Sequence, residues 1–554
     1  MRSLARSLFI LLALSLLPAH AFAQTAQKTG TGIISGHVAI GDKPAEGVVV
    51  IVVPGEPRPD RREVARAVTD YEGNYRLMGL PAGRFNVVPL APTLVGPADN
   101  TYGGSGRFLI LGEGETVEKI DFNMARAGVI TGRVTDADGR PVVEERLQLT
   151  PVDNPARGRF GGFYNPYMYQ TDDRGVYRLY GIPAGRYTLS VGVSPDESMV
   201  RGGVVKRGYY PRTFYPGETD SKKAGIIEVT EGGEAKDINI RLGRQSQSFT
   251  VRGRVVSADG GSPVPNLIIG YGGYDPQQKV ISAYSYGQYR TNARGEFKVD
   301  GVVPGRFAAF VWSENENYSD PVMFEVTDAD VSGVEIKLKR GATITGRIQL
   351  EGTTDKKIMA HLTKIILGAS VQTASLGPPE TRQATIEPDG SFRLTGLPPG
   401  RAQLVMFDMQ SQKNIRLLRI ERDGAPLPNN IIEITPGAEV VNIRVIFEYG
   451  SGTILGQVRL ENGTLTEGAR LFVSVLKAGD DENSQPVTYA QADARGRFII
   501  DGLVAGEYQV IVQAQIPSPA GQAKFVRGKQ GVTVSNGAET EATITLDMSE
   551  GKEQ

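Results

Sequence analysis

The chain has 554 residues, more than one hydrophobic core usually serves, so several domains are expected. Acidic and basic residues nearly cancel, at 62 against 61, which leaves no electrostatic argument for binding nucleic acid or an anionic membrane. Cysteine is absent, which excludes disulfides, lipid-modified cysteines and cysteine nucleophiles.

Residues 1–23 have the pattern of an export signal. Arg2 and Arg6 give a positive start, residues 9–17 form a short apolar run, and Ala21-Phe22-Ala23 fits the rule for a cleavage site. The apolar run is too short to span a bilayer comfortably, and no later stretch reaches transmembrane length. We therefore predict cleavage after Ala23 and a secreted or periplasmic mature protein. An uncleaved anchor is the alternative.

A glycine-rich signature then recurs five times, close to Asp-x-x-Gly-x-(Tyr/Phe)-x-x-x-Gly-x-x-x-Gly-Arg-(Tyr/Phe). Its copies begin one small domain apart, and their first glycines are Gly73, Gly175, Gly295, Gly390 and Gly496. About forty residues before each copy stands Gly-x-Val or Gly-x-Ile, at Gly36, Gly132, Gly253, Gly346 and Gly456. The spacing predicts one module per copy, with bounds 31–126, 128–244, 249–340, 342–449 and 452–548.

The second copy shows the expected strands most clearly. Residues 129–134 and 146–149 alternate apolar and polar side chains, and an Asp-Gly turn lies between them at 136–139. The signature itself is a turn, a strand, a Gly-Pro-Gly turn and a returning strand, ending at Val191. Six or seven short strands and no convincing helix predict an all-β fold of five tandem Ig-like or prealbumin-like β-sandwiches.

The repeated residues can be given structural roles. Glycine supplies backbone freedom at the turns, and the aromatic residue fills the core between the sheets. We expect the arginine after the last glycine to make a cross-strand or edge charge pair; an anion site is the alternative. The linkers at 126–128, 340–341 and 450–452 are very short, which favours a semi-rigid rod over flexible beads.

This pattern resembles the carboxypeptidase regulatory-like family, whose domains are transthyretin-like β-sandwiches. The resemblance rests on Gly-x-(Val/Ile), the Asp-Gly turn, Pro-Val and the signature, and is best in Thr69–Phe85 and Thr171–Tyr187. It covers about Thr31 to Met548. The fourth copy departs most, since Glu387-Pro388-Asp389-Gly390 replaces the usual turn and Ala402 replaces the aromatic. The resemblance implies an accessory module rather than a particular activity.

No catalytic constellation stands out in the sequence. After the signal only His37 and His361 remain, and neither has the spacing of a zinc site or a catalytic triad. A two-carboxylate hydrolase is not excluded by counting acids. Calcium is a minor possibility at the acidic turns 136–138, 328–330 and 480–482, where ordinary Asx turns are the alternative. We therefore predict no enzyme, no metal and no cofactor.

Tyrosines are concentrated in residues 160–290, which hold 14 of the 21 in the chain. Tyrosine beside Gly, Asn and Gln is typical of a sugar- or peptide-binding surface, but it also suits packing between modules. The candidate ligand-binding residues are Tyr164, Tyr167, Tyr169, Tyr209, Tyr210, Tyr215, Tyr271, Tyr274, Tyr284 and Tyr286. The sequence does not decide between these two roles.

Three functional hypotheses follow. The first is an exported, non-catalytic binding or scaffold protein whose second and third modules take carbohydrate or a surface protein. The second is a purely structural stalk or spacer. The third is a hydrolase with a hidden carboxylate site, or an accessory subunit of one. The oligomeric state is left open.

Overall fold

The computed structural model describes residues 30–553, with gaps at 56–61, 97–105, 154–168, 194–207, 278–279, 313–315, 360–361, 363–364, 373–379, 408–413, 466–468, 482–483, 485, 517–523 and 551. The predicted signal, residues 1–23, lies outside the described residues. The described part is almost entirely β-structure, as the sequence predicts. Its helical elements are short: α4 (Lys356–Met359), η1 (Ser221–Lys223), η3 (Pro428–Asn430) and η4 (Met548–Glu550). None of the helices in this part could cross a membrane.

The strands gather around five separate hydrophobic clusters, one for each copy of the signature. We call the sandwich around each cluster a module and number the modules in chain order. In every module the first strand pairs antiparallel with the signature strand and parallel with a later strand. The modules therefore share one topology.

The first sheet of each module contains these two pairings. Its strands are, in the first module, β1 (Gly32–Ile40), β2 (Lys43–Pro44), β5 (Asn74–Leu80), β7 (Leu94–Val95), β9 (Thr116–Val117) and β10 (Phe122–Arg126); in the second, β11 (Gly128–Thr135), β13 (Val176–Ile182), β18 (Glu234–Ala235) and β19 (Ile240–Arg241); in the third, β21 (Phe249–Ser257), β24 (Glu296–Val302), β26 (Asn317–Ser319) and β28 (Val331–Arg340); in the fourth, β29 (Ala342–Glu351), β32 (Thr385–Ile386), β33 (Ser391–Leu397), β35 (Ile415–Arg422), β36 (Ala425–Pro426) and β38 (Glu439–Tyr449); in the fifth, β39 (Gly452–Glu461), β42 (Arg497–Leu503) and β45 (Glu539–Asp547).

The second sheet covers the other side of each core. Its strands are, in the first module, β3 (Val49–Pro54), β4 (Ala65–Val68), β6 (Gly83–Leu90) and β8 (Arg107–Leu111); in the second, β12 (Leu147–Pro151), β14 (Gly185–Val191), β16 (Thr213–Phe214) and β17 (Ile227–Val229); in the third, β22 (Ile268–Asp275), β23 (Val280–Arg290), β25 (Gly305–Trp312) and β27 (Val322–Val326); in the fourth, β30 (Ile366–Gln372), β31 (Glu380–Gln383), β34 (Gly400–Phe407) and β37 (Ile431–Ile434); in the fifth, β40 (Arg470–Lys477), β41 (Thr488–Gln491), β43 (Gly506–Ile516), β44 (Lys524–Val534) and β46 (Lys552–Glu553). A separate pair, β15 (Gly208–Tyr209) and β20 (Ser246–Gln247), joins the second module to the start of the third.

The two sequence landmarks of each repeat meet in space. The glycine of Gly-x-(Val/Ile) lies directly opposite the signature aromatic in the strand register, in the pairs Gly36–Tyr75, Gly132–Tyr177, Gly253–Phe297, Gly346–Phe392 and Gly456–Phe498. A Cβ on Gly456 would lie 1.9 Å from the Phe498 ring, so only glycine leaves room for the aromatic. All five aromatic side chains are buried, as predicted.

The signature turn is an Asx turn in which a side-chain oxygen accepts two backbone N–H groups. Asp172 Oδ1 accepts from Arg174 N and Val176 N, and Asp70, Asn292 and Asp493 repeat the pattern. Gly175 has φ of 72°, in the left-handed region that glycine adopts without a steric penalty. In the fourth module the turn departs, as its sequence indicates, and Asp389 Oδ1 accepts from Ser391 N instead.

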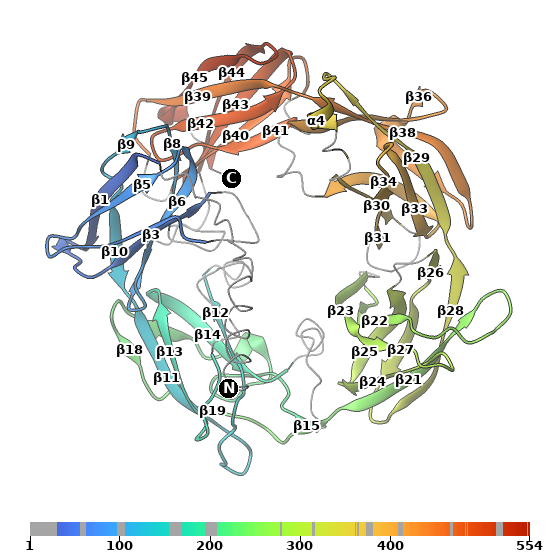
Figure 1. Cartoon of the computed structure of the whole chain (residues 1–554). Coiled ribbons are helices and arrows are strands. Elements are labelled where there is room, and N and C mark those ends of the chain that lie inside the picture. Colours follow the sequence, from blue (N-terminus) through green and yellow to red (C-terminus); the bar gives the residue numbers. More distant parts are fainter. Residues whose placement is uncertain are drawn as a thin grey trace, which may run out of the picture.

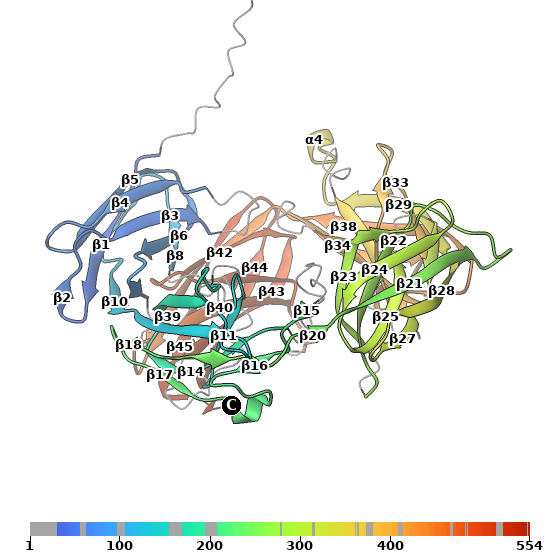
Figure 2. The same cartoon turned by 90° about the horizontal axis from the view of Figure 1, so that it is seen from below.

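The five modules follow one another around a ring, and the first module lies against the fifth (Figure 1). Figure 2 shows the same ring from below, with the third and fourth modules opposite the first. The very short linkers favour a semi-rigid rod over flexible beads; in the structure the chain turns at each junction, so the modules follow a closed path (Figure 1). Linker length alone carries no information about the direction of that turn.

Glycines lie where the chain enters the modules. A Cβ on Gly341 would lie 2.5 Å from the backbone of Gly396, and one on Gly450 would lie 2.4 Å from the carbonyl oxygen of Gly502. The backbone entering the fourth and the fifth module is therefore packed directly on the second signature turn of that module. Gly30 makes the same contact with Leu80 in the first module.

Candidate functional site

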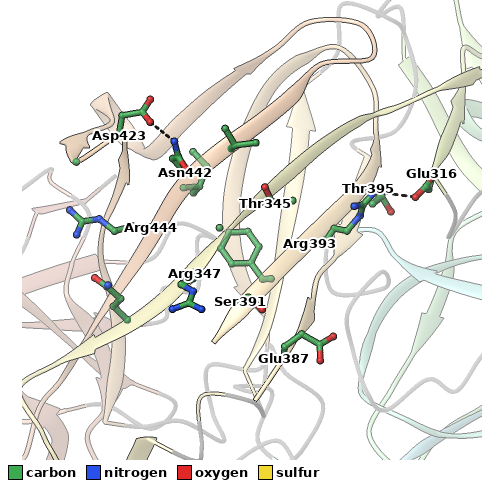
Figure 3. Close-up of a pocket in the computed structure, with 16 residues that line it drawn as sticks. Glu316, Thr345, Arg347, Glu387, Ser391, Arg393, Thr395, Asp423, Asn442 and Arg444 are labelled. Carbon is green, nitrogen blue, oxygen red and sulfur yellow. Dashed lines mark hydrogen bonds and ion pairs between the residues drawn. The ribbon is translucent and has the colours of Figure 1, made fainter. Parts of the chain in front are cut away.

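A hollow of about 1140 Å³ lies on the outer face of the first sheet of the fourth module (Figure 3). Strands β29, β33 and β38 supply its floor, Glu316 of the third module borders one end, and the β35–β36 turn borders the other. The labelled side chains of Thr345, Arg347 and Arg393 come from strand positions that alternate with core residues, so they point away from the core.

The charges around this hollow are already paired. Arg347 Nη2 lies 2.7 Å from Asp389 Oδ2, and Arg393 Nη2 lies 3.1 Å from Glu316 Oε1. Arg444 is paired with Glu421. The Arg393–Glu316 pair joins two modules, since Glu316 belongs to the third. These contacts give the arginines a structural role in place of a free anion-binding role.

The hydroxyl chemistry of the hollow does not favour nucleophilic catalysis. Ser391 Oγ donates to Asp389 Oδ1 at 2.6 Å. The Ser391 hydroxyl and N–H groups and the nearby Arg347 hold the pKa of Asp389 below its usual range, which makes this carboxylate a weak base. No histidine lines the hollow. The described residues also contain no group of three side chains placed to hold a metal ion.

The acidic turns considered for calcium make local hydrogen bonds. Asp136 Oδ1 accepts from Asp138 N and Arg140 N, which is an Asx turn. Asp330 accepts from Thr250 N and from the guanidinium of Arg252. In these turns the carboxylates are engaged in stabilising the loop.

The described tyrosines of the second module pack against cores. Tyr169, Tyr210 and Tyr215 contact the core of the second module, and Tyr169 Oη donates to the Tyr180 carbonyl at 3.0 Å. Tyr209 instead packs against the core of the third module, and β15 that carries it pairs with β20. Of these side chains, Tyr209 therefore links the second module to the third.

The tyrosines of the third module are divided between two faces. Tyr271 is buried in the core, with its ring edge-on to Tyr289 at 5.9 Å between centroids. Tyr274 packs on the opposite face of the same sheet, against a small cluster containing Ile281 and Phe310. Tyr284 and Tyr286 lie on β23, but their side chains are outside the described residues, as are Tyr164 and Tyr167 entirely. Ligand binding by these ten tyrosines stays a prediction.

The signature arginine makes the expected cross-strand pair in two modules. Arg306 lies opposite Glu325 and Arg401 opposite Glu433 in the strand register, and both pairs are within 3.4 Å. In the second module the opposite residue is also acidic, Glu228, although Arg186 pairs with Asp153. The fifth module carries Glu507 at this position.

The first module is the exception, because Ile110 lies opposite Arg84. With no acid across the strand, Arg84 reaches into the fifth module. Its Nη2 lies 2.7 Å from Asp501 Oδ2 and donates to the Ile499 carbonyl at 3.1 Å. Ile110 is only 7% exposed although it lies outside the core cluster of its own module. The burial of Ile110 therefore comes from the neighbouring fifth module.

A second group of contacts joins the signature turn of the fifth module to the first module. Arg495 Nη1 and Arg497 Nη1 each lie 2.7 Å from Glu115 Oε1, and Arg495 Nη2 donates to the Ile110 carbonyl at 2.6 Å. Asp493 accepts from Arg495 and, at 3.4 Å, from the Ile110 N–H. We call this interface the clasp: Arg84, Ile110 and Glu115 on the first module, and Asp493, Arg495, Arg497 and Asp501 on the fifth.

The electrostatics of the clasp favour the charged forms of Glu115 and Arg495. Burial alone would raise the pKa of Glu115, but the Gly112 N–H and the guanidinium groups of Arg495 and Arg497 outweigh burial and lower it. The ion pairs with Glu115 and Asp493 raise the pKa of Arg495 despite its burial. Within the clasp, Glu115, Asp493, Arg495 and Arg497 therefore form one partly buried network.

The fourth module reaches the same corner of the ring. Arg416 is buried and donates from Nη2 to the Asp501 carbonyl at 3.3 Å. Its Nη1 has no hydrogen-bond partner among the described residues, and burial lowers the pKa of this guanidinium. Asp501 thus touches the first module through its side chain and the fourth module through its backbone.

Sequence reasoning did not identify the clasp as a site. Its groups are about 380 positions apart along the chain. A signal was nevertheless present: when the repeats are aligned, the residue across the strand from the signature arginine is acidic in the second, third and fourth modules and is Ile110 in the first. That one substitution distinguishes Arg84 from the signature arginines of the other modules.

Comparisons with known proteins find likeness among solved structures. No family model matches the chain, and no curated protein matches it. Solved structures with some likeness include a streptococcal ancillary pilin (TM-score 0.24, 10% identity, 55% of this chain and 98% of that one) and GBS52, the minor pilin of Streptococcus agalactiae (0.20, 11%, 39% and 96%). The Bacillus anthracis TIE protein is another (0.15, 11%, 75% and 73%). Scores this low carry no argument about function.

Proposed function

We propose that this protein is an exported, non-catalytic structural scaffold, a spacer of fixed curvature built from five β-sandwiches. The observation that carries the proposal is the clasp, in which charged side chains of the first and fifth modules neutralise one another and close the ring. The charged residues of this repeated fold stabilise turns, pair across strands and join modules. Such an arrangement fits a mechanical role better than a catalytic one.

The other features agree with this proposal. The arginines Arg347 and Arg393 of the hollow on the fourth module are paired, and the lowered pKa of Asp389 makes this carboxylate a weak base. The candidate tyrosines whose side chains are described pack against hydrophobic clusters. The carboxypeptidase regulatory-like resemblance, which rests on sequence motifs, is compatible with an accessory domain and specifies no activity.

Export is tested by the mature N-terminus. Expression with a C-terminal tag, followed by fractionation and mass spectrometry, should give a chain beginning at residue 24 in the periplasmic or extracellular fraction. A chain that keeps residues 1–23 and stays in the cytoplasm contradicts the exported scaffold.

The non-catalytic role is tested on purified residues 24–554. Peptide, ester and glycoside substrates should give no turnover above a heat-treated control. In intact cells, photo-crosslinkers on exposed positions of several modules should capture envelope proteins. Turnover that disappears with S391A or D389N would instead locate an active site in the hollow of the fourth module and overturn the proposal.

A further inference from the structure

The clasp differs from every other module junction in one respect: its two sides are far apart in the sequence. Neighbouring modules are joined by the backbone itself, as at Gly341 and Gly450. Among the described residues, the first and fifth modules meet through side-chain contacts and the backbone groups of Ile110. These contacts can separate without any change inside the sandwiches, whose cores are independent clusters.

The two sides of the clasp are complementary. The first module offers Glu115 to two arginines and Arg84 to one aspartate, while the fifth module offers the reverse charges. The Ile110 N–H and carbonyl groups add hydrogen bonds that any copy of β8 could make. The complementarity therefore belongs to the two surfaces, whichever chain carries each of them.

We infer that the clasp is an exchangeable docking surface whose second occupant is another copy of this chain. When the ring opens, the fifth module of one chain docks on the first module of another, and the second pair of surfaces closes a two-chain ring. This is domain exchange, which preserves every contact of the closed monomer. The curvature set by the packed junctions keeps the two surfaces of one chain close together, so the monomer dominates at low concentration.

The exposure of the arginine in the signature turn supports a specific docking role for the turn of the fifth module. The Arg495 side chain is 27% exposed, whereas the corresponding Arg174 and Arg294 of the second and third modules are 79% and 80% exposed. All three follow the same Asx turn. Of these three copies, only the one in the fifth module is covered by another module, and that module, the first, is not its neighbour in the sequence.

Charge reversal gives a direct test with the mature chain. E115R places arginine opposite Arg495 and Arg497, and R495E/R497E places two glutamates opposite Glu115. In each variant, like charges face each other where the first and fifth modules of one chain meet. Mixed together, the two variants restore opposite charges at both interfaces of a two-chain ring. R174E/R294E, which reverses the two exposed counterparts, is the matched control.

Two readouts follow the exchange. Light scattering after size exclusion gives the mass, and spin labels at E113C and A494C give the distance across the clasp, since the chain has no other cysteine. Glu113 and Ala494 are exposed and lie two and one positions from Glu115 and Arg495. Circular dichroism checks that each variant is folded. If R495E/R497E lowers the folded fraction, R497E replaces it.

We expect the native chain and the control to be monomers with a short label distance. Each reversed variant alone should be a monomer with a long, broad distance distribution. An equimolar mixture should double in mass and regain the short distance between a label at 113 on one chain and a label at 494 on the other. A short distance in the single variants overturns the inference, as does a mixture that stays at the mass of one chain.

Discussion

The same turn occurs in the second and the fifth module, and its surroundings differ. Asp172 and Arg174 stand in solvent, and Asp172 stabilises its own turn through two backbone hydrogen bonds. Asp493 and Arg495 make the equivalent local contacts, but they also bind β8 of the first module, and the Asp493 side chain is fully buried. A repeated local structure thus acquires a long-range role when one copy meets a partner.

The largest effect is expected from D493A. This change removes two turn hydrogen bonds and leaves Arg495 partly buried beside the first module with one carboxylate fewer, so the fifth module should lose about 3–5 kcal/mol of stability. Calorimetry that resolves the module transitions should show the fifth module unfolding earlier. D172A, the matched change in solvent, should shift its own module far less. Equal shifts would mean that the clasp adds nothing to the turn.

I110E should open the ring. A glutamate at position 110 would give Arg84 the cross-strand partner that Glu325 gives Arg306, and it would place a charge where Ile110 is buried. We expect the closed fraction to fall by about tenfold or more, because burying the new carboxylate and drawing Arg84 away from Asp501 should together cost more than about 1.4 kcal/mol. Small-angle scattering should show a larger radius of gyration. I110V keeps the apolar contact and should leave the radius unchanged.

Acid should weaken the clasp. The pKa of Glu115 lies below its ordinary value in the closed ring, so the closed form binds this proton less readily than the open form. The contribution of Glu115 is therefore complete above the ordinary carboxyl pKa and is lost as the pH falls through the lowered one. The label distance across the clasp should lengthen between about pH 5 and pH 3. E115Q removes this titration, and an unchanged pH profile in that variant would assign the opening to other carboxylates.

R174A and R294A should have the smallest effects. Both side chains are about four-fifths exposed, and their ion pairs lie at the surface, where such pairs contribute little. Each should change the unfolding free energy by no more than about 0.5 kcal/mol, with the ring closed. R495A, in contrast, should raise the radius of gyration. A result in which all three behave alike would remove the distinction between the exposed and the covered turn.

The sequence was sufficient for the fold because the fold is local and repeated. Gly253 and Phe297 lie 44 positions apart, and the same pair recurs in every module, so repetition identifies it as part of the sandwich. The alternation of apolar residues in 129–134 predicts β11 almost to its ends. The signature arginines at 306 and 401 make the cross-strand pairs that their position in a returning strand suggests.

The ring could not be predicted in the same way. Its closure depends on Glu115 and Arg495, which share no period and no neighbouring residues, and on the direction in which each junction turns. That direction depends on contacts between modules, such as the one between Arg393 and Glu316, which strand periodicity does not describe. The tyrosine-rich segments were open to two interpretations because tyrosine suits both packing and binding.

Because the first and fifth modules are in contact, the five modules are arranged as a cycle. A circular permutant can be made by cutting the backbone at 243–248, where the second and third modules are joined, and by linking the fifth module to the first. These changes would leave every sandwich intact. Such a circular permutant should fold, because each module keeps its own core and all module contacts remain available. In that permutant the clasp would become a covalent junction, and the present junction of the second and third modules would become the point at which the ring can open.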